Sequence, residues 1–215
     1  MTGAGPGIPL VIAAPSGTGK TSVCRRLLEI DANVEFSVSH TTRPIRDGER
    51  NGMDYHFVDT EEFRRMVDAG EFLEWAEYGG NFYGTSWQAI EGPLAAGRDL
   101  LLEIEVQGAR QVRERLTTAG FVFLLPPSLE SLQERLEGRK TDTPEQVAKR
   151  LAIAQTELAA IEEFDFAIVN DEVEDCARDL CEILRARRAG DPNPVEGRFD
   201  PRAAAERFRY ASTST

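Results

Sequence analysis

Four continuous apolar runs constrain the fold of this chain more than any other feature of its sequence. Runs without apolar and polar alternation are typical of strands that are buried on both faces of a parallel sheet. The runs are IPLVIA at 8–13, DLLLEIEV at 99–106, FVFLLP at 121–126 and FDFAIVN at 164–170. Apolar residues at helical spacing accompany them, namely Leu129, Leu132 and Leu136, then Val147, Leu151, Ala154, Leu158 and Ile161, then Ala177, Leu180 and Leu184. This alternation predicts an α/β doubly wound fold with a mainly parallel central sheet flanked by helices.

The length of the chain allows one well-buried core, so we expect a single domain over its 215 residues. No apolar run approaches the roughly 20 residues that cross a bilayer. The first residues, MTGAGPGIPLVIAAP, lack the basic region of a signal peptide. We therefore expect a cytoplasmic protein that has no membrane partner.

The net charge of -12 limits the possible partners. Its field repels phosphate polymers, which argues against nucleic acid as a partner and requires any phosphate site to be local. Cys24, Cys176 and Cys181 have no zinc-site spacing and are predicted to be reduced thiols. The sequence leaves the oligomeric state open.

Two parts of the chain depart from the strand and helix alternation. Short aromatic and alternating segments surround a predicted helix at 60–69, which we expect Thr60 to cap. Charge density rises between two predicted helices in RLEGRKTDTPEQVAKR. Both ends are rich in Gly, Pro and small polar residues and are expected to fray. The predicted division is a core of 8–37 and 91–188, an inserted lobe at 38–90, a lid at 135–150, and flexible tails at 1–7 and 190–215.

The segment APSGTGKTS directly follows the first apolar run and begins a helical pattern. Glycines in this position let successive amide hydrogens point at one anion, and the helix N-terminus adds its positive dipole end. The segment fits the P-loop pattern except that Ala14 stands at the first glycine position. A glycine-rich turn with an accidental lysine is less favoured, because strand, glycines, lysine, hydroxyl and helix occur in order. The residues predicted to bind nucleotide phosphates are Ala14, Pro15, Ser16, Gly17, Thr18, Gly19, Lys20, Thr21 and Ser22.

A P-loop alone is compatible with a GTPase switch, an ATPase motor or a small-molecule kinase. The stretch SVSHTTRPIRDGERNGMDY at 37–55 adds Arg43, Arg46 and Arg50 within a loop shaped by Pro and Gly. Arginine grips a phosphate with two parallel hydrogen bonds, so this cluster in an acidic chain indicates a local site for a monophosphate. Arg50 is interpreted as a solvated neighbour of the other two arginines.

Taken together, the motifs resemble those of the guanylate kinase family. The matching segments are APSGTGKTS, SVSHTTRPIRDGERNGMDYHFV, GEFLEWAEYGGNFYGT, VQGARQV, FLLPPSLESLQERLEGR and VND, and they cover about residues 8–188. The resemblance implies a P-loop kinase fold, with the inserted lobe for the nucleoside monophosphate and a small lid. It also implies the reaction of ATP with GMP to give ADP and GDP, with Mg²⁺ as cofactor and ATP and GMP as small-molecule substrates.

The resemblance assigns roles to individual residues. The arginines and tyrosines would hold the GMP phosphate, the carboxylates and hydroxyls would read guanine, and Glu49 would hold the arginines in place. Without the resemblance, a position on the outer face of a half-buried strand is the preferred interpretation of Glu74. The implied GMP-binding set is Ser39, Arg43, Arg46, Glu49, Tyr55, Glu74, Tyr83, Thr85 and Glu105.

Phosphoryl transfer requires aligned substrates, neutralised charge and exclusion of water rather than a side-chain nucleophile. The implied magnesium ligand is Thr21, with Glu103 acting through water, and Asn170 is implied to lie near the adenine. His40 and His56 are interpreted as structural residues. The implied catalytic set is Lys20, Arg43, Arg135, Arg139 and Arg150.

Glu103 and Glu105 stand where the family usually has aspartates, which changes the reach of both carboxylates. The first alternative function is a catalytically inactive guanylate-kinase-like interaction module, which would not need an intact P-loop. A kinase for another nucleoside monophosphate is the second, and carboxylates at Glu74 and Glu105 argue against it. A regulatory GTPase ranks last, since the chain lacks an NKxD motif.

Overall fold

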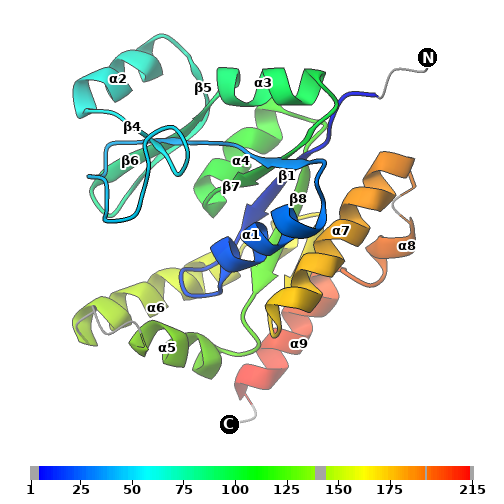
Figure 1. The fold of residues 1–215 in the computed structure, drawn as a ribbon. Coiled ribbons are helices and arrows are strands. Elements are labelled where there is room, and N and C mark those ends of the chain that lie inside the picture. The colour runs from blue at the N-terminus through cyan, green and yellow to red at the C-terminus, as the bar shows by residue number, and fades with distance from the viewer. Residues whose placement is uncertain (1–4, 139–143, 192, 214–215) are drawn as a thin grey trace.

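The computed structural model describes residues 5–138, 144–191 and 193–213 of the chain. Its main sheet has the strand order β2-β7-β1-β8-β9, and every neighbouring pair is parallel (Figure 1). These strands are β1 (Pro9–Ala13), β2 (Val34–Phe36), β7 (Asp99–Glu103), β8 (Gly120–Leu125) and β9 (Phe166–Val169). The predicted parallel α/β fold is therefore confirmed.

Apolar side chains project from both faces of this sheet, and helices cover both faces. On one face, α1 (Lys20–Ile30) and α7 (Val173–Ala189) pack against strand residues such as Leu10 and Ile12. The other face is covered by α3 (Trp87–Ala95), α4 (Val106–Arg115), the 3₁₀ helix η1 (Ile161–Glu163) and α9 (Pro201–Thr213). The core is thus two apolar layers separated by the sheet.

The inserted segment forms a second, smaller sheet with the order β4-β3-β6-β5. Its own apolar cluster consists of Phe63, Met66 and Phe72, which pack α2 against the sheet. Helix α2 is capped by Asp59, whose side chain accepts a hydrogen bond from the Glu62 amide at 2.8 Å, so the predicted Thr60 cap is wrong by one residue. The elements are β3 (His40–Thr41), β4 (His56–Phe57), α2 (Thr60–Asp68), β5 (Phe72–Tyr78) and β6 (Asn81–Ser86).

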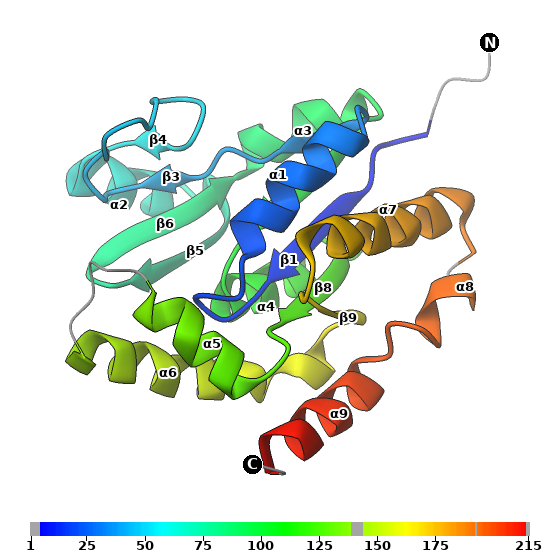
Figure 2. The same ribbon diagram turned by 60° about the horizontal axis from the view of Figure 1, so that its bottom comes forward.

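A helix pair, α5 (Leu129–Glu137) and α6 (Pro144–Leu158), lies across from this smaller sheet in the second view (Figure 2). Leu132, Leu136, Val147 and Ala154 form the apolar cluster that joins the two helices. The predicted lid at 135–150 spans the end of α5 and the start of α6, and its residues 139–143 lie outside the described part. The P-loop therefore lies between an inserted lobe and a helix pair.

The C-terminal segment differs from its prediction, because 190–215 was expected to be a flexible tail. It forms α8 (Asn193–Glu196) and α9, and the Phe199 carbonyl accepts a 2.8 Å hydrogen bond from the Ala167 amide of β9. Val195 and Phe199 join the core layer of α1 and α7, while Phe208 joins the opposite layer. Few apolar residues in a polar, proline-containing segment gave too weak a pattern to show this packing.

Phe199→Ala is expected to lower the free energy of unfolding by about 3 kcal/mol, because the buried ring leaves a cavity in the core. Urea denaturation would measure this loss, and steady-state kinetics would stay within twofold of wild type. Val169→Ala is the control, since Val169 is 47% exposed and truncation there should cost under about 0.5 kcal/mol. Equal losses for the two variants would contradict the packing of the C-terminal segment.

Candidate active site

The site forms at the carboxyl edge of the main sheet, where loops from parallel strands meet. The glycine-rich loop follows β1, Glu105 follows β7, and Asn170 follows β9. Strand β7 ends at Glu103 and α4 begins at Val106, so the predicted run at 99–106 is strand only as far as Glu103. The Glu103 and Glu105 carboxylates, at the end of the strand and just after it, lie beside the loop.

Two glycines give the loop its curvature. Gly17 and Gly19 have φ angles of 95° and 96°, a region that residues with a Cβ rarely adopt. A Cβ would also lie 2.9 Å from Leu136 Cδ2 at the first position and 2.8 Å from Asn170 Nδ2 at the second. Helix α1 begins directly afterwards without a side-chain cap or an acidic residue in its first turn, so its N-terminus is available for an anion.

The Thr18 carbonyl fixes the backbone of the loop. It accepts hydrogen bonds from Asn170 Nδ2 at 2.7 Å and from Arg135 Nη1 at 3.0 Å, and the second Arg135 nitrogen donates to the Asn170 carbonyl at 3.2 Å. The Asn170 side chain is buried. Both residues therefore contact the backbone of the loop, and their adenine and catalytic roles stay predictions.

Lys20 extends from the loop to the end of β7. Its Nζ donates to the Ile104 carbonyl at 2.8 Å and lies 3.5 Å from Glu105 Oε1. Burial opposes the charge on Lys20, but the carboxylates of Glu105 and Glu103 outweigh it and raise the pKa of the amine. The lysine is therefore held as a cation at the mouth of the loop.

Thr21 and Glu103 meet beside this lysine, with the threonine hydroxyl donating to Glu103 Oε1 at 2.6 Å. Hydroxyl and carboxylate oxygens are the donors that Mg²⁺ prefers, and the ion usually takes few protein ligands together with substrate phosphates. Among the described residues no cluster of three or more His, Cys, Asp or Glu could hold a metal on its own. The residues present thus fit a magnesium ion that arrives with a nucleotide.

Glu74 is a buried carboxylate in the inserted lobe, only 4% exposed. A register shift between Phe72 and Glu74 in the pairing of β5 with β6 explains why the adjacent Leu73 is buried as well. Glu74 Oε1 accepts hydrogen bonds from the Thr85 amide at 3.0 Å and the Thr85 hydroxyl at 2.7 Å. The outer-face position considered for Glu74 is therefore wrong.

A cavity of about 300 Å³ lies against Glu74 and extends to Lys20. Gly108 of α4 borders it, and a Cβ there would lie 2.4 Å from Glu74 Oε2. Ser39 Oγ is 3.2 Å from Thr85 Oγ1, so the predicted hydroxyls and this carboxylate are adjacent. Burial raises the pKa of Glu74 to about 7, although the hydrogen bonds from Thr85 act in the opposite direction.

A second cavity of about 550 Å³ contains the predicted phosphate-binding residues. Arg43 donates to Glu49 Oε1 at 2.7 Å, and the Arg46 amide donates to Glu49 Oε2 at 2.8 Å. These contacts lower the pKa of Glu49, first through the hydrogen bond from Arg43. The rings of Tyr55 and Tyr83 lie edge to face with centroids 6.1 Å apart. Arginine and tyrosine side chains from separate segments therefore line the same cavity.

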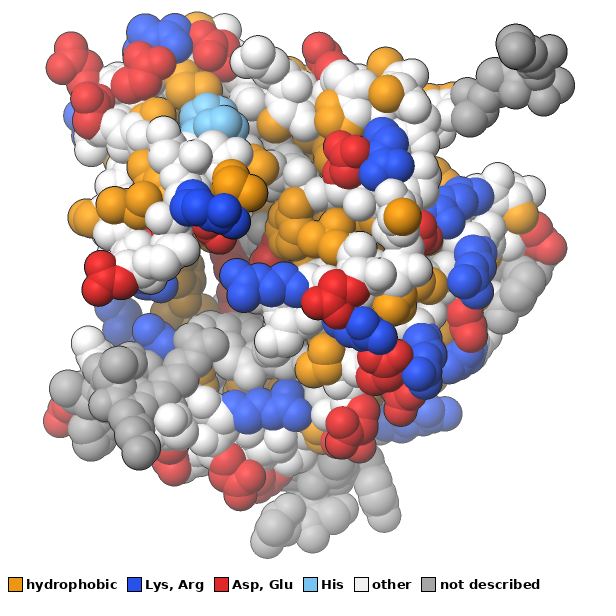
Figure 3. Space-filling view, viewed as in Figure 1, with side chains coloured by type: hydrophobic (Ala, Val, Ile, Leu, Met, Phe, Trp, Pro, Cys, Tyr) orange, Lys and Arg blue, Asp and Glu red, His pale blue; other side chains and the backbone are white. Residues whose placement is uncertain are grey.

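The other two predicted lid arginines are Arg150 and Arg139. Arg150 lines a cavity of about 690 Å³ between α6 and the turn after β5, and not the cavity of the glycine-rich loop. Arg139 lies outside the described residues. In the space-filling view, a hollow with Lys or Arg side chains along its rim separates the inserted lobe from the α5 and α6 pair (Figure 3). The lid arginines thus remain predictions for catalysis.

Sequence reasoning missed several residues at the site. Tyr78 lines the glycine-rich loop, the Glu74 cavity and the lid cavity. Glu157 of α6 approaches Glu105, and burial, followed by the charge of Glu105, raises the pKa of Glu157 to about 8. Gln111 exchanges two hydrogen bonds with the Trp75 backbone, at 3.2 and 2.7 Å, and so fixes β5 beside α4. Tyr78 and Gln111 lie within the segments GEFLEWAEYGGNFYGT and VQGARQV that resemble the family, but no role was predicted for either. Each contact joins segments far apart in the sequence, so residue spacing alone does not reveal it.

None of the helices in the described ranges combines the length and apolar character that spanning a bilayer requires.

The glycine-rich loop lies opposite an inserted lobe that contains arginines, phenols and a buried carboxylate. Fold and site together define a P-loop phosphotransferase with an inserted lobe beside its glycine-rich loop.

Comparisons with known proteins narrow this class. The family model described as guanylate kinase matches residues 7–187. A guanylate kinase of Dechloromonas aromatica is 54% identical over 82% of this chain and 87% of its own length, and one of Aromatoleum aromaticum is 50% identical over 89% and 94%. The crystal structure of guanylate kinase from Anaplasma phagocytophilum superposes with a TM-score of 0.72 and 38% identity, covering 85% of this chain and 87% of that chain. This chain belongs to the guanylate kinase family.

Proposed function

We propose that the protein transfers the terminal phosphoryl group of ATP to GMP, giving ADP and GDP, with the residues described above in specific roles. The choice of GMP as the phosphoryl acceptor rests on Glu74. Its carboxylate is buried and borders a cavity, and its Oε2 atom lies next to Gly108 of α4. Guanine presents N1–H and an amine as donors at the edge where adenine presents an acceptor. A buried carboxylate accepts from guanine and loses its partners if adenine takes the place.

The 550 Å³ cavity would hold the phosphate of GMP. Arg43 and Arg46 supply positive donors, and Tyr55 and Tyr83 add hydroxyls. Glu49 already orients Arg43 through its carboxylate, which reduces the entropy lost when the arginine binds phosphate. Ser39 and Tyr83 border both this cavity and the Glu74 cavity, which therefore suit the two ends of one nucleotide.

The glycine-rich loop would cradle the phosphates of ATP through its amides, and Lys20 would neutralise charge that develops during transfer. Thr21 and Glu103 would hold Mg²⁺, Glu103 through water. When bound, Mg²⁺ supplies a positive charge that neutralises the phosphate oxygens. Glu105 orients Lys20, and its carboxylate also borders the Glu74 cavity, where it would read guanine with Glu74.

Closure of the lobe and of the lid at 135–150 would exclude water from the transfer. Arg135, Arg139 and Arg150 would then reach the transferring phosphates, and Asn170 would support the loop near the adenine. The domain division into core, lobe, lid and N-terminal tail, and a cytoplasmic location, belong to the same proposal. Cell fractionation with a specific antibody tests the location.

The direct test is ADP production in a coupled assay, with ATP and Mg²⁺ held fixed while GMP, AMP, CMP and UMP are offered separately. Turnover with GMP is expected, and kcat/KM for AMP should be lower by on the order of 10⁴. Turnover with another nucleotide instead would keep the kinase and overturn the guanine-reading role of Glu74. No turnover from folded protein would favour an inactive interaction module.

GMP affinity is expected to fall as the pH drops below about 7. Glu74 is protonated below its raised pKa of about 7, and the ionised form is the better acceptor for guanine. Titration calorimetry at pH 7.5 and 5.5 should show about a tenfold weaker Kd at the lower pH, partly because the GMP phosphate titrates near pH 6.

Glu74→Gln separates the two contributions to this pH dependence. The glutamine does not titrate, so only the part due to the nucleotide phosphate should remain. The raised pKa of Glu74 affects folding stability in the opposite direction from GMP affinity. The folded protein binds the Glu74 proton more tightly than the unfolded chain does, so this contribution to stability is present at low pH and is lost as the pH rises through about 7. An identical pH profile in wild type and variant would refute the assignment to Glu74.

A further inference from the structure

The 550 Å³ cavity has a cation on its core side that the proposed roles do not use. Arg43 and Arg46 enter this cavity from the inserted lobe, whereas Arg25 enters from helix α1. Thr21 and Leu28 also line the cavity, and residues three or four positions apart share a helix face. Arg25 is therefore on the face of α1 that is directed at the expected acceptor phosphate.

Arg25 has no hydrogen bond or ion pair with any other residue in the described ranges 5–138, 144–191 and 193–213. The acidic side chains that line the same cavity already have partners. Glu103 accepts from Thr21 at 2.6 Å, and Asp54 accepts from the Arg50 amide at 2.8 Å. Glu49 accepts from Arg43 at 2.7 Å. The charge of Arg25 is thus left uncompensated by a specific contact in a cavity suited to an anion.

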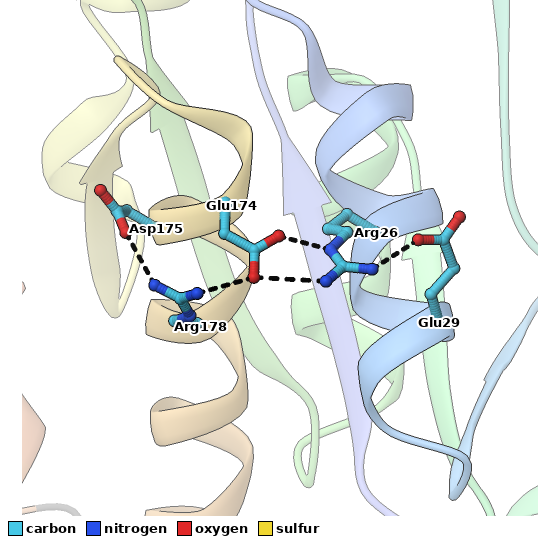
Figure 4. Close-up of polar contacts among 5 residues, drawn as sticks. All are labelled: Arg26, Glu29, Glu174, Asp175 and Arg178. Atoms are coloured by element: carbon cyan, nitrogen blue, oxygen red, sulfur yellow. Dashed lines mark hydrogen bonds and ion pairs between the residues drawn. The ribbon is translucent and has the colours of Figure 1, made fainter.

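The next residue in the chain provides a contrast. Arg26 donates to Glu174 Oε2 of α7 at 2.5 Å and to Glu29 Oε2 at 2.7 Å (Figure 4). Arg178 joins the same network through Glu174 and Asp175. Consecutive residues are about 100° apart around a helix, so Arg26 faces α7 while Arg25 faces the cavity. Arg26 joins two helices, whereas Arg25 has no polar partner within the described part of the chain.

We propose that Arg25 is a further substrate-binding residue, which contacts the phosphate monoester of the acceptor nucleotide from the core side. This inference rests on the proposed function of the cavity. The guanidinium lies on a rigid helix next to Thr21, opposite the arginines of the lobe. It therefore opposes Arg43 and Arg46 across the phosphate and holds the nucleotide against the core while the lobe closes.

The test compares Arg25→Gln with Arg26→Gln, two adjacent substitutions that remove the same charge. Arg25→Gln is expected to weaken GMP binding about 10- to 100-fold, as for the loss of a charge-assisted hydrogen bond, without changing the KM for ATP. Guanosine, which lacks the phosphate, should bind both variants as it binds wild type. Arg26→Gln should leave GMP affinity unchanged and affect only thermal stability. Arg25→Lys should restore part of the GMP affinity, because it keeps the charge without the fork.

GMP affinity of Arg25→Gln within twofold of wild type would overturn the inference. An equal loss of guanosine affinity would also overturn it, since the effect would then be structural. Glutamine is a good helix former at this exposed position, so the variant should fold, which circular dichroism verifies. If wild-type protein neither binds nor phosphorylates GMP, the proposed function itself fails, and that result is distinct from a silent Arg25 variant.

Discussion

Replacing Lys20 with methionine is expected to lower kcat by roughly a thousandfold, because the P-loop then lacks the cation that neutralises charge during transfer. Methionine is similar in length and has no charge, so the space is filled while the donor is lost. Stopped-flow or coupled measurement of ADP release, with both substrates saturating, gives the change in kcat directly. Comparable loss in single-turnover experiments would assign the defect to the chemical step.

Lys20→Arg serves as the comparison for this variant. It keeps the positive charge but introduces a planar fork where Lys20 Nζ reaches the Ile104 carbonyl at 2.8 Å, so activity should stay low. Both variants also remove the ammonium beside Glu105, and calorimetric melting would show that they remain folded. Methionine variants with more than a tenth of wild-type kcat would refute a transfer role for this residue.

Gly108→Ala is expected to weaken GMP binding by about a hundredfold or more, although alanine ordinarily stabilises a helix by about 1 kcal/mol relative to glycine. The added Cβ would lie 2.4 Å from Glu74 Oε2 and 3.1 Å from its Cδ. The carboxylate must then move away from its hydrogen bonds with Thr85 or into the cavity that suits guanine. Calorimetry with GMP measures the loss, and binding of an ATP analogue to the same variant should be unchanged.

Gly92→Ala is the matched control for this effect. Gly92 is also helical, but a Cβ there meets no described atom within 4 Å apart from its chain neighbours and the backbone of its own helix, so GMP affinity should equal that of wild type. Unchanged GMP affinity in Gly108→Ala would mean that the cavity beside Glu74 does not hold the base. Equal losses for GMP and the ATP analogue would indicate a general structural defect.

Much of the fold was predictable because its signals are local. Each run that is buried on both faces, such as 8–13, was recognisable without knowing its neighbours. Helix α6 was marked by apolar residues at helical spacing. The C-terminal helices were missed because Val195 and Phe199 are buried by partners in α1 and α7, which no property of residues 190–215 reveals.

The residues of the candidate site likewise differ in whether the sequence alone could identify them. The glycines and Lys20 form one continuous motif, so the loop was found from residue types and spacing alone. Glu74 depended on the family resemblance, since an isolated carboxylate in a strand is compatible with exposure. Gly108 and Glu157 were missed, because their importance arises from the approach of α4 and α6 to carboxylates elsewhere in the chain.

The order of the strands has a consequence for synthesis of the protein on the ribosome. Strand β1 is made first, yet Leu10 pairs with Leu101 of β7 and is adjacent to Gly120 of β8. At ordinary translation rates the partners appear on the order of 10 s later. The smaller sheet, from residues 40–86, is contiguous in sequence and can form during this interval. The glycine-rich loop acquires its full support only when Asn170 emerges, so this loop is translated well before the residues that complete it.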